Sequence, residues 1–205
     1  MRRACPCCAT DPTRGLTPIS QLPLVSSCPT HDCRLEPFFG DIGRLTGWEQ
    51  RRDQPVPVDR HIVAMDRRTL EGFDNGALTL PRRTVHVGVW LRLLRSLLDE
   101  LNTPTSLLRT RPRRLIEQVW QAAGRRTRNG EIAWLPYEAM PWPRQEAMLN
   151  AAATALHLLE AGTITGTGTL AGLLRAQHYQ PADPGSPPVP PPPSRPIRGR
   201  PCTKR

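Results

Sequence analysis

Apolar residues recur at intervals of three and four positions in the second half of the chain, which is the spacing of one face of an α-helix. The first such stripe follows Thr84, a residue suited to cap a helix N-terminus, and stops before Pro104. The pattern therefore predicts a helix over 84–102. Its apolar members are Val87, Trp90, Leu91, Leu94, Leu97, Leu98 and Leu101.

Further helical stripes follow along the chain. A shorter stripe between Pro112 and Gly124 predicts a second helix. A third helix is expected to open at Pro143 and to end at Gly162, because proline suits the first turn and glycine the residue after the last. A short fourth helix is expected over 170–175. The stripes of the second and third helices contain Ile116, Val119, Trp120 and Ala123, then Met148, Leu149, Ala152, Leu156 and Leu159.

Strand signals are sparse, and the best is the run Ile62-Val63-Ala64-Met65. We therefore expect a mostly α protein with four zones: a small cysteine-rich head at 1–40, a connector at 41–82, a helical body at 83–175 that forms a small bundle, and a tail at 176–205. The tail holds ten of the 24 prolines and several arginines, so it is expected to be a disordered Pro/Arg-rich segment.

The cysteines suggest a metal site, because five of the six lie within the first 33 residues. Two residues separate Cys5 from Cys8, and after nineteen intervening residues Cys28 and His31 repeat that spacing. Each pair can form a knuckle that directs two ligands at one ion, and the head is then a zinc-knuckle unit. Four protein ligands leave no position for a substrate water, so the predicted Zn²⁺ site is structural.

Two more cysteines compete for this site. Cys7 could replace Cys5 or Cys8, and Cys33 could replace His31, since each lies within two residues of a favoured ligand. The favoured set remains the two pairs with two intervening residues, which is the usual knuckle spacing. The other interpretation is a group of scattered thiols that bind no metal.

The head resembles the zinc-binding segment of TniQ family proteins. In that family an Arg-x-Cys-Pro-x-Cys motif is followed by an acidic residue, a short apolar stretch and a Cys-Pro-x-His signature. The runs Arg3-Ala4-Cys5-Pro6-Cys7-Cys8, then Asp11, Leu22 to Val25 and Cys28-Pro29-Thr30-His31 are similar to these parts. Residues 97–101 and 146–155 are similar to helical regions of actinobacterial-type members. We expect a short or divergent member, because family members usually carry several dozen residues before the first cysteine pair.

The resemblance implies a role in DNA transposition. Family members help a transposon to choose its target by linking a DNA-bound or guide-bound recognition element to the transposition machinery, and they are not the transposase. The partners expected from this resemblance are DNA and a transposition ATPase or other transposition subunits. No small-molecule substrate is implied.

The chain has a net charge of +10, and its densest basic segment flanks the second predicted helix. Seven arginines within twenty residues could neutralise several phosphates, which predicts salt-dependent binding to DNA. The alternative is a solvated face in a chain that is rich in arginine throughout. The seven are Arg109, Arg111, Arg113, Arg114, Arg125, Arg126 and Arg128.

Other function classes are disfavoured by the sequence. No apolar run approaches the length that spans a bilayer, and the first residues do not form a signal peptide, so a cytoplasmic bacterial protein without membrane contact is expected. No histidine lies in a recognisable nucleophile signature, which predicts that the protein is not an enzyme. The leading hypothesis is a zinc-binding accessory protein of transposition that acts in target-site selection. The alternatives are a stand-alone zinc-finger DNA-binding regulator and an inactive remnant of a mobile element.

Overall fold

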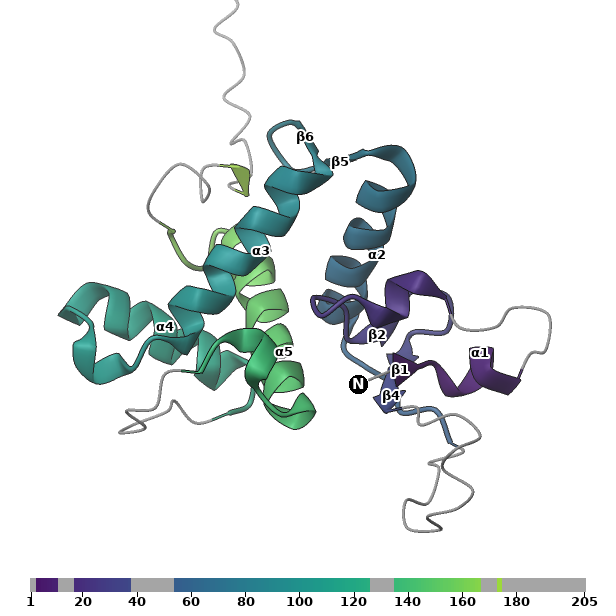
Figure 1. Ribbon diagram of the computed structural model, residues 1–205. Coiled ribbons are helices and arrows are strands. Elements are labelled where there is room, and N and C mark those ends of the chain that lie inside the picture. Colours follow the sequence, from purple (N-terminus) through teal and green to yellow (C-terminus); the bar gives the residue numbers. More distant parts are fainter. Residues whose placement is uncertain (1–2, 11–16, 38–53, 126–134, 167–172, 175–205) are drawn as a thin grey trace, which may run out of the picture.

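The computed structural model describes residues 3–10, 17–37, 54–125, 135–166 and 173–174, and the following account refers to these. It has a small N-terminal head of short strands and turns, followed by a mostly helical body (Figure 1). The elements of the body, in chain order, are α2 (Arg60–Asn75), β5 (Ala77–Thr79), β6 (Thr84–His86), α3 (Val87–Asn102), η3 (Thr105–Leu107), α4 (Thr110–Ala122), η4 (Tyr137–Ala139) and α5 (Trp142–Glu160).

The head, of which residues 3–10 and 17–37 are described, is built from two antiparallel strand pairs. β1 (Arg3–Ala4) pairs with β4 (Glu36–Pro37), and β2 (Ser27–Cys28) pairs with β3 (Cys33–Arg34). Along the sequence, α1 (Pro6–Thr10) and η1 (Pro18–Gln21) lie between β1 and β2. These elements are too short to bury a core of ordinary size, so the head depends on other links to hold its shape.

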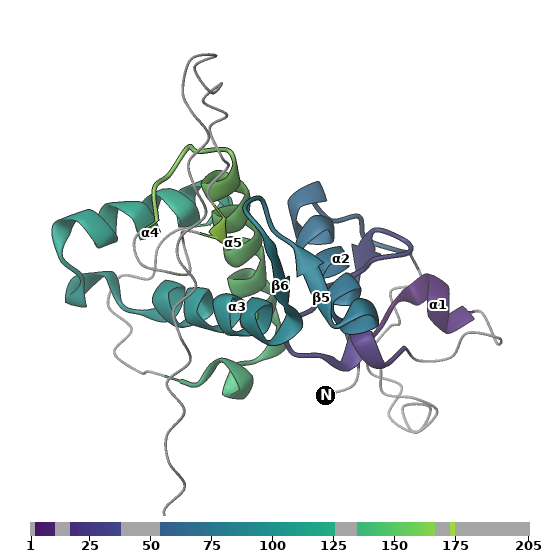
Figure 2. The same ribbon diagram turned by 90° about the horizontal axis from the view of Figure 1, so that it is seen from above.

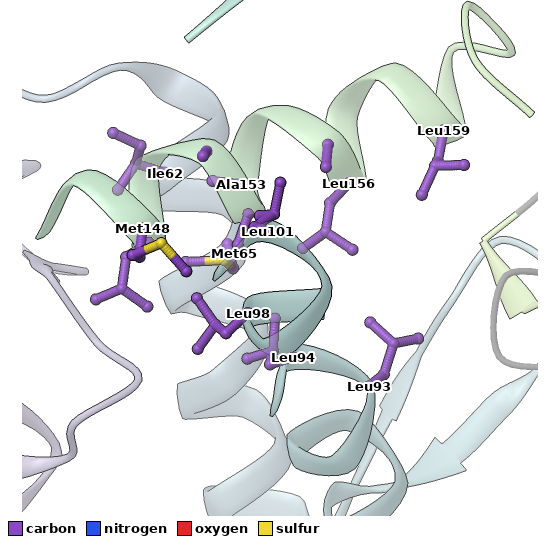
Figure 3. Packing of buried hydrophobic residues seen from close by; sticks show 14 of the residues in the cluster. Ile62, Met65, Leu93, Leu94, Leu98, Leu101, Met148, Ala153, Leu156 and Leu159 are labelled. Atoms are coloured by element: carbon purple, nitrogen blue, oxygen red, sulfur yellow. The ribbon is translucent and has the colours of Figure 1, made fainter. Parts of the chain in front are cut away.

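The body is organised around α5, which packs against α2, α3 and α4. Its sequence is apolar on nearly every side, with alanines that let neighbouring helices approach closely, as is typical of a central buried helix. Leucines of α3 and Met65 of α2 complete the core around it (Figure 3). The large side chain of Trp90 is fully buried, and its indole N–H donates to the Thr69 hydroxyl at 3.0 Å.

The predicted helices at 84–102, after Pro112 and at Pro143 are present, with changed starting points. α3 begins at Val87 rather than after Thr84, because Thr84 belongs to β6 and His86 caps the helix by accepting from the Gly88 N–H at 3.0 Å. α4 already begins at Thr110. α5 has Pro143 in its first turn, and Gly162 follows its end with a φ of 70°.

The run Ile62 to Met65, the best strand signal in the sequence, is not a strand but lies within α2. Segment 41–82, predicted as a connector, thus contains a helix of 16 residues and the β5 strand of a hairpin. The buried face of α2 includes the polar residues Asp66 and Thr69. These residues interrupt the apolar stripe, so the helical spacing is not visible from apolar positions alone. The fourth predicted helix falls outside the described residues except for 173–174, and the tail at 176–205 falls outside them entirely.

None of the helices in the described ranges combines the length and the apolar character that crossing a membrane requires.

A buried carboxylate joins the head to the body. Asp66 of α2 is 0% exposed, and its Oδ2 accepts from the backbone N–H of Ser26 at 3.1 Å and of Ser27 at 2.7 Å. The hydroxyls of both serines donate to the same oxygen, at 3.4 and 2.6 Å. The segment that leads into Cys28 is therefore fixed against α2.

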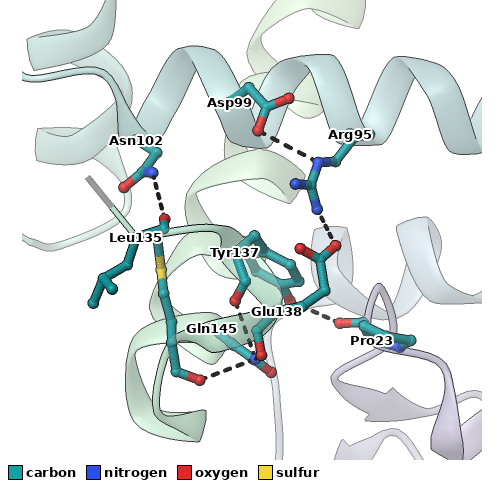
Figure 4. A network of polar contacts seen from close by, with 9 residues as sticks. Pro23, Arg95, Asp99, Asn102, Leu135, Tyr137, Glu138 and Gln145 are labelled. Carbon is teal, nitrogen blue, oxygen red and sulfur yellow. Dashed lines mark hydrogen bonds and ion pairs between the residues drawn. The ribbon is translucent and has the colours of Figure 1, made fainter.

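Two more contacts fasten the head. The buried guanidinium of Arg3 donates to the carbonyl oxygens of Leu22 and Val25 and lies 4.4 Å from the centre of the Trp142 ring. The Tyr137 hydroxyl donates to the Pro23 carbonyl at 2.7 Å (Figure 4). A hydrogen bond thus links the head to η4, and a cation–π contact links it to the start of α5.

The turn that carries Tyr137 is held by its own polar network (Figure 4). Arg95 of α3 forms ion pairs with Asp99 and with Glu138 of η4. The Gln145 side chain donates to the carbonyls of Tyr137 at 3.1 Å and of Met140 at 3.0 Å. These contacts fix η4 and so fix the tyrosine that reaches the head.

We predict an unusual titration for Asp66. Burial raises its pKa to about 6 from an ordinary 3.8, although the serine hydrogen bonds act in the opposite direction. The folded state then holds the proton more tightly than the unfolded state, so the free energy of unfolding should fall as the pH rises from about 4 to about 6. The Asp66 carboxyl carbon, assigned with Asp66→Asn and followed by ¹³C NMR, should titrate near pH 6. A midpoint below about 4 would show that the hydrogen bonds outweigh burial.

Candidate metal centre

The first knuckle is formed where β1 turns into α1. Cys5 immediately precedes the helix, and Pro6 occupies its first position, where a missing N–H costs nothing. The Cys5 carbonyl accepts from the Ala9 N–H at 2.9 Å, and the Cys8 N–H points at the Cys5 sulfur at 3.4 Å. This single helical turn places the sulfurs of Cys5 and Cys8 on the same side.

The second knuckle is the turn of the β2–β3 hairpin. Cys28 and Cys33 face each other across the strands, and the turn between them carries His31. Asp32 closes the turn with a φ of 50°, a conformation that aspartate tolerates better than most residues, and its N–H donates to the Cys28 carbonyl at 2.9 Å. Arg67 of α2 pairs with the Asp32 carboxylate at 2.7 Å, which supports the turn from outside.

The two knuckles bring three sulfurs and one imidazole nitrogen together. The Nδ1 atom of His31 lies 3.4 Å from the sulfurs of Cys5 and Cys8 and 3.5 Å from that of Cys28. The sulfurs of Cys8 and Cys28 are 3.9 Å apart. Around one tetrahedral zinc ion, sulfur and nitrogen ligands would be separated by about 3.5 Å and two sulfurs by about 3.8 Å. The four side chains could therefore hold one metal ion, and their spacing fits zinc.

The three sulfur donors of this cluster are shielded from solvent, and the imidazole is not. Cys5, Cys8 and Cys28 are buried, whereas His31 is exposed. Fully buried Val25 and Leu35 pack against the sulfurs. Three thiolates and one imidazole complete a tetrahedral shell, so an ion held here would have no position for a substrate water.

Without a bound cation, the surroundings of this cluster disfavour deprotonation of the Cys5 and Cys8 thiols. Burial raises the pKa of Cys5, and burial together with the neighbouring Cys28 raises the pKa of Cys8 to about 12. A divalent cation reverses this effect, because it stabilises the thiolate directly. The cluster is thus suited to bind a metal with release of protons.

Both competing cysteines lie close to the same cluster. The Cys33 sulfur is 3.4 Å from that of Cys5, and the sulfurs of Cys5, Cys7 and Cys33 all lie within 4.8 Å of one another. Among the cysteines in the described ranges, none forms a disulfide. The structure therefore shows two overlapping donor groups, which share Cys5.

Sequence reasoning missed the residues that support the cluster from behind. Asp66 fixes the backbone just before Cys28, and Arg3 binds the carbonyls of Leu22 and Val25. Arg3 stood in the motif run but was given no role. Asp66 had one weak signal: it lies three or four positions from Ile62, Val63 and Thr69, which places it on the buried face of a helix.

The arginines of the predicted patch that the structure describes do not form one cluster. Arg109, Arg111, Arg113 and Arg114 are exposed around the first turn of α4. Arg125 lies beyond the other end of that helix, about 20 Å away along its axis, where it lines a cavity with Arg34 and Glu146. Arg126 and Arg128 fall outside the described residues.

Comparisons with protein-family models, with curated proteins and with solved structures gave no match.

We predict that metal binding releases protons. Because three sulfhydryl groups become thiolate ligands, loading the metal-free chain near neutral pH should release about three protons per ion. Calorimetric titrations with zinc in two buffers of different ionisation enthalpy measure this number. Release of less than one proton would show that the cysteines are not the ligands.

Proposed function

We propose that this chain is a non-enzymatic, zinc-binding accessory protein of DNA transposition, which acts in target-site selection by contacting DNA, the transposition machinery or both. The observation that carries the proposal is the convergence of Cys5, Cys8, Cys28 and His31 at the spacing of one tetrahedral ion. These ligands lie in the segment that resembles TniQ family proteins. The resemblance supplies the transposition setting, and the donor geometry supports the zinc.

The zinc ion has a structural task in this proposal. A Cys₃His shell fills all four positions, so the ion neither activates water nor binds a carbonyl group. It links the first knuckle, at the start of α1, to the β2–β3 hairpin. The hydrogen bonds from Ser26 and Ser27 to Asp66 then connect the hairpin to α2 of the body.

The surface proposed to contact DNA is the start of α4. Its first turn contains no acidic residue, and no described acidic side chain pairs with Arg109, Arg111 or Arg114. Arg113 pairs with Glu117 one turn later, at 2.8 Å. Positive charge at a helix N-terminus opposes the helix dipole, so these arginines are unfavourable there until an anion binds. A phosphate would relieve this repulsion, because it interacts with both the dipole and the guanidinium groups.

This arrangement separates the two proposed contacts. In two views related by a rotation about the horizontal axis, α4 lies at one end of the molecule and α1 of the head at the other (Figures 1 and 2). DNA bound at α4 leaves the head accessible to a transposition ATPase or another subunit. The exposed Leu107, at 76% exposure just before the arginines, adds an apolar contact beside the proposed DNA surface.

We predict that the arginines at the start of α4 carry DNA binding. The triple variant Arg109→Ala, Arg111→Ala, Arg114→Ala should bind duplex DNA more weakly, with the slope of log K against log salt reduced by about two to three. Fluorescence anisotropy over a salt series measures this. The matched control, Arg60→Ala, Arg83→Ala, Arg92→Ala, removes the same charge from exposed positions elsewhere and should retain most of the binding. Equal losses in both variants would contradict a specific surface.

The transposition setting has its own test. Insertions of the mobile element in host cells should become fewer, or should lose their target preference, when this chain is absent. The triple arginine variant should reproduce that loss if DNA contact is the relevant step. Unchanged insertion together with a footprint at one promoter would instead support a stand-alone regulator.

A further inference from the structure

The head contains more soft donors than one tetrahedral ion uses. Cys5, Cys8, Cys28 and His31 complete one shell, while Cys7 and Cys33 lie beside it. The sulfurs of Cys5, Cys7 and Cys33 form a second group within 4.8 Å, and only Cys5 belongs to both groups. In this second group the Cys5 and Cys33 sulfurs are in contact at 3.4 Å.

The second group is a chemically uniform site. Its three donors are all sulfur, with no carboxylate or imidazole among them. Cys5 and Cys33 are 3% and 2% exposed, and Cys7 is half-buried, so an ion could enter past Cys7. Three thiolates around a trigonal ion, with bonds of about 2.3 Å, would lie about 4 Å apart. The observed group is compact enough to close around such an ion.

We propose that Cys5, Cys7 and Cys33 form a second site for a soft, thiophilic d¹⁰ cation of the Cu(I) or Cd(II) class, bridged to the first ion by the Cys5 thiolate. Soft cations favour all-thiolate shells, and a low coordination number suits three donors. A thiolate sulfur has lone pairs enough to bind two cations. This inference depends on the proposed function, because the Cys5 sulfur can bridge two ions only if the site of Cys5, Cys8, Cys28 and His31 also holds one.

A bridged pair would couple the two knuckles more strongly than one ion does. Cys33 lies on β3 and Cys7 on α1, so the second ion joins the same two elements at a different point. It also shields the Cys5 sulfur, which lies between the two ions. Occupancy of the second site should therefore depend on occupancy of the first, because both draw on one thiolate.

The test loads the full metal-free chain with ¹¹³Cd(II) under reducing conditions and counts ions by elemental analysis and by ¹¹³Cd NMR. Wild-type protein should bind two ions and give two resonances, each split by coupling through the Cys5 sulfur. Cys7→Ser and Cys33→Ser should each bind one ion and give one unsplit resonance. Cys202→Ser, which changes a cysteine far from the head in sequence, is the matched control and should still bind two.

The outcomes separate this inference from the proposed function. One ion in the wild type overturns the second site and leaves the first intact, whereas no ion overturns both. Two unsplit resonances overturn the bridge, and two ions in both serine variants overturn the donor set. Cys7 is half-buried, so its serine variant should fold even if Cys33→Ser, at a buried position, does not.

Discussion

The shape of the head depends on a constraint of size: its core is too small to hold itself together. Among the described residues, six form that core: the cysteines Cys5, Cys8, Cys28 and Cys33 and the aliphatic Val25 and Leu35, with Ile19 and Leu22 packed against them and partly buried. Burying two aliphatic side chains contributes roughly 3–6 kcal/mol. A structural zinc ion contributes about 10–16 kcal/mol in small zinc domains near neutral pH. A metal ion at the cysteines would therefore be the dominant stabilising contact of the head.

The head is also fixed to the helical body. The fixation is polar and buried, with Asp66 holding the two serines before Cys28 and Arg3 lying over Trp142. Burying these charges costs free energy, so the directional contacts that they make define one relative position of the two parts better than apolar contacts alone would. These contacts join the head to α2 and to the first residue of α5.

The sequence was informative where local physics decides the structure. The two cysteine pairs come together because a helical turn and a hairpin turn each fix their own spacing, and the α3 and α5 stripes survive because their buried faces are apolar. It was misleading for α2, where Ile62-Val63-Ala64-Met65 favours a strand by local preference. The buried polar side chains of Asp66 and Thr69 bind residues that are distant in the sequence, Ser27 and Trp90, and no local pattern can show these contacts. The divided arginine patch is likewise a consequence of helix length in three dimensions.

Metal content and thermal unfolding, measured on the same samples, show whether a metal ion at Cys5, Cys8, Cys28 and His31 holds the head together. Elemental analysis should find about one zinc per wild-type chain, and Cys28→Ser should have lost it and should unfold at a lower temperature. Cys202→Ser, as the matched control, should keep both the metal and the unfolding temperature. Folded wild-type protein without zinc, equal in stability to the Cys28→Ser variant, would contradict the account.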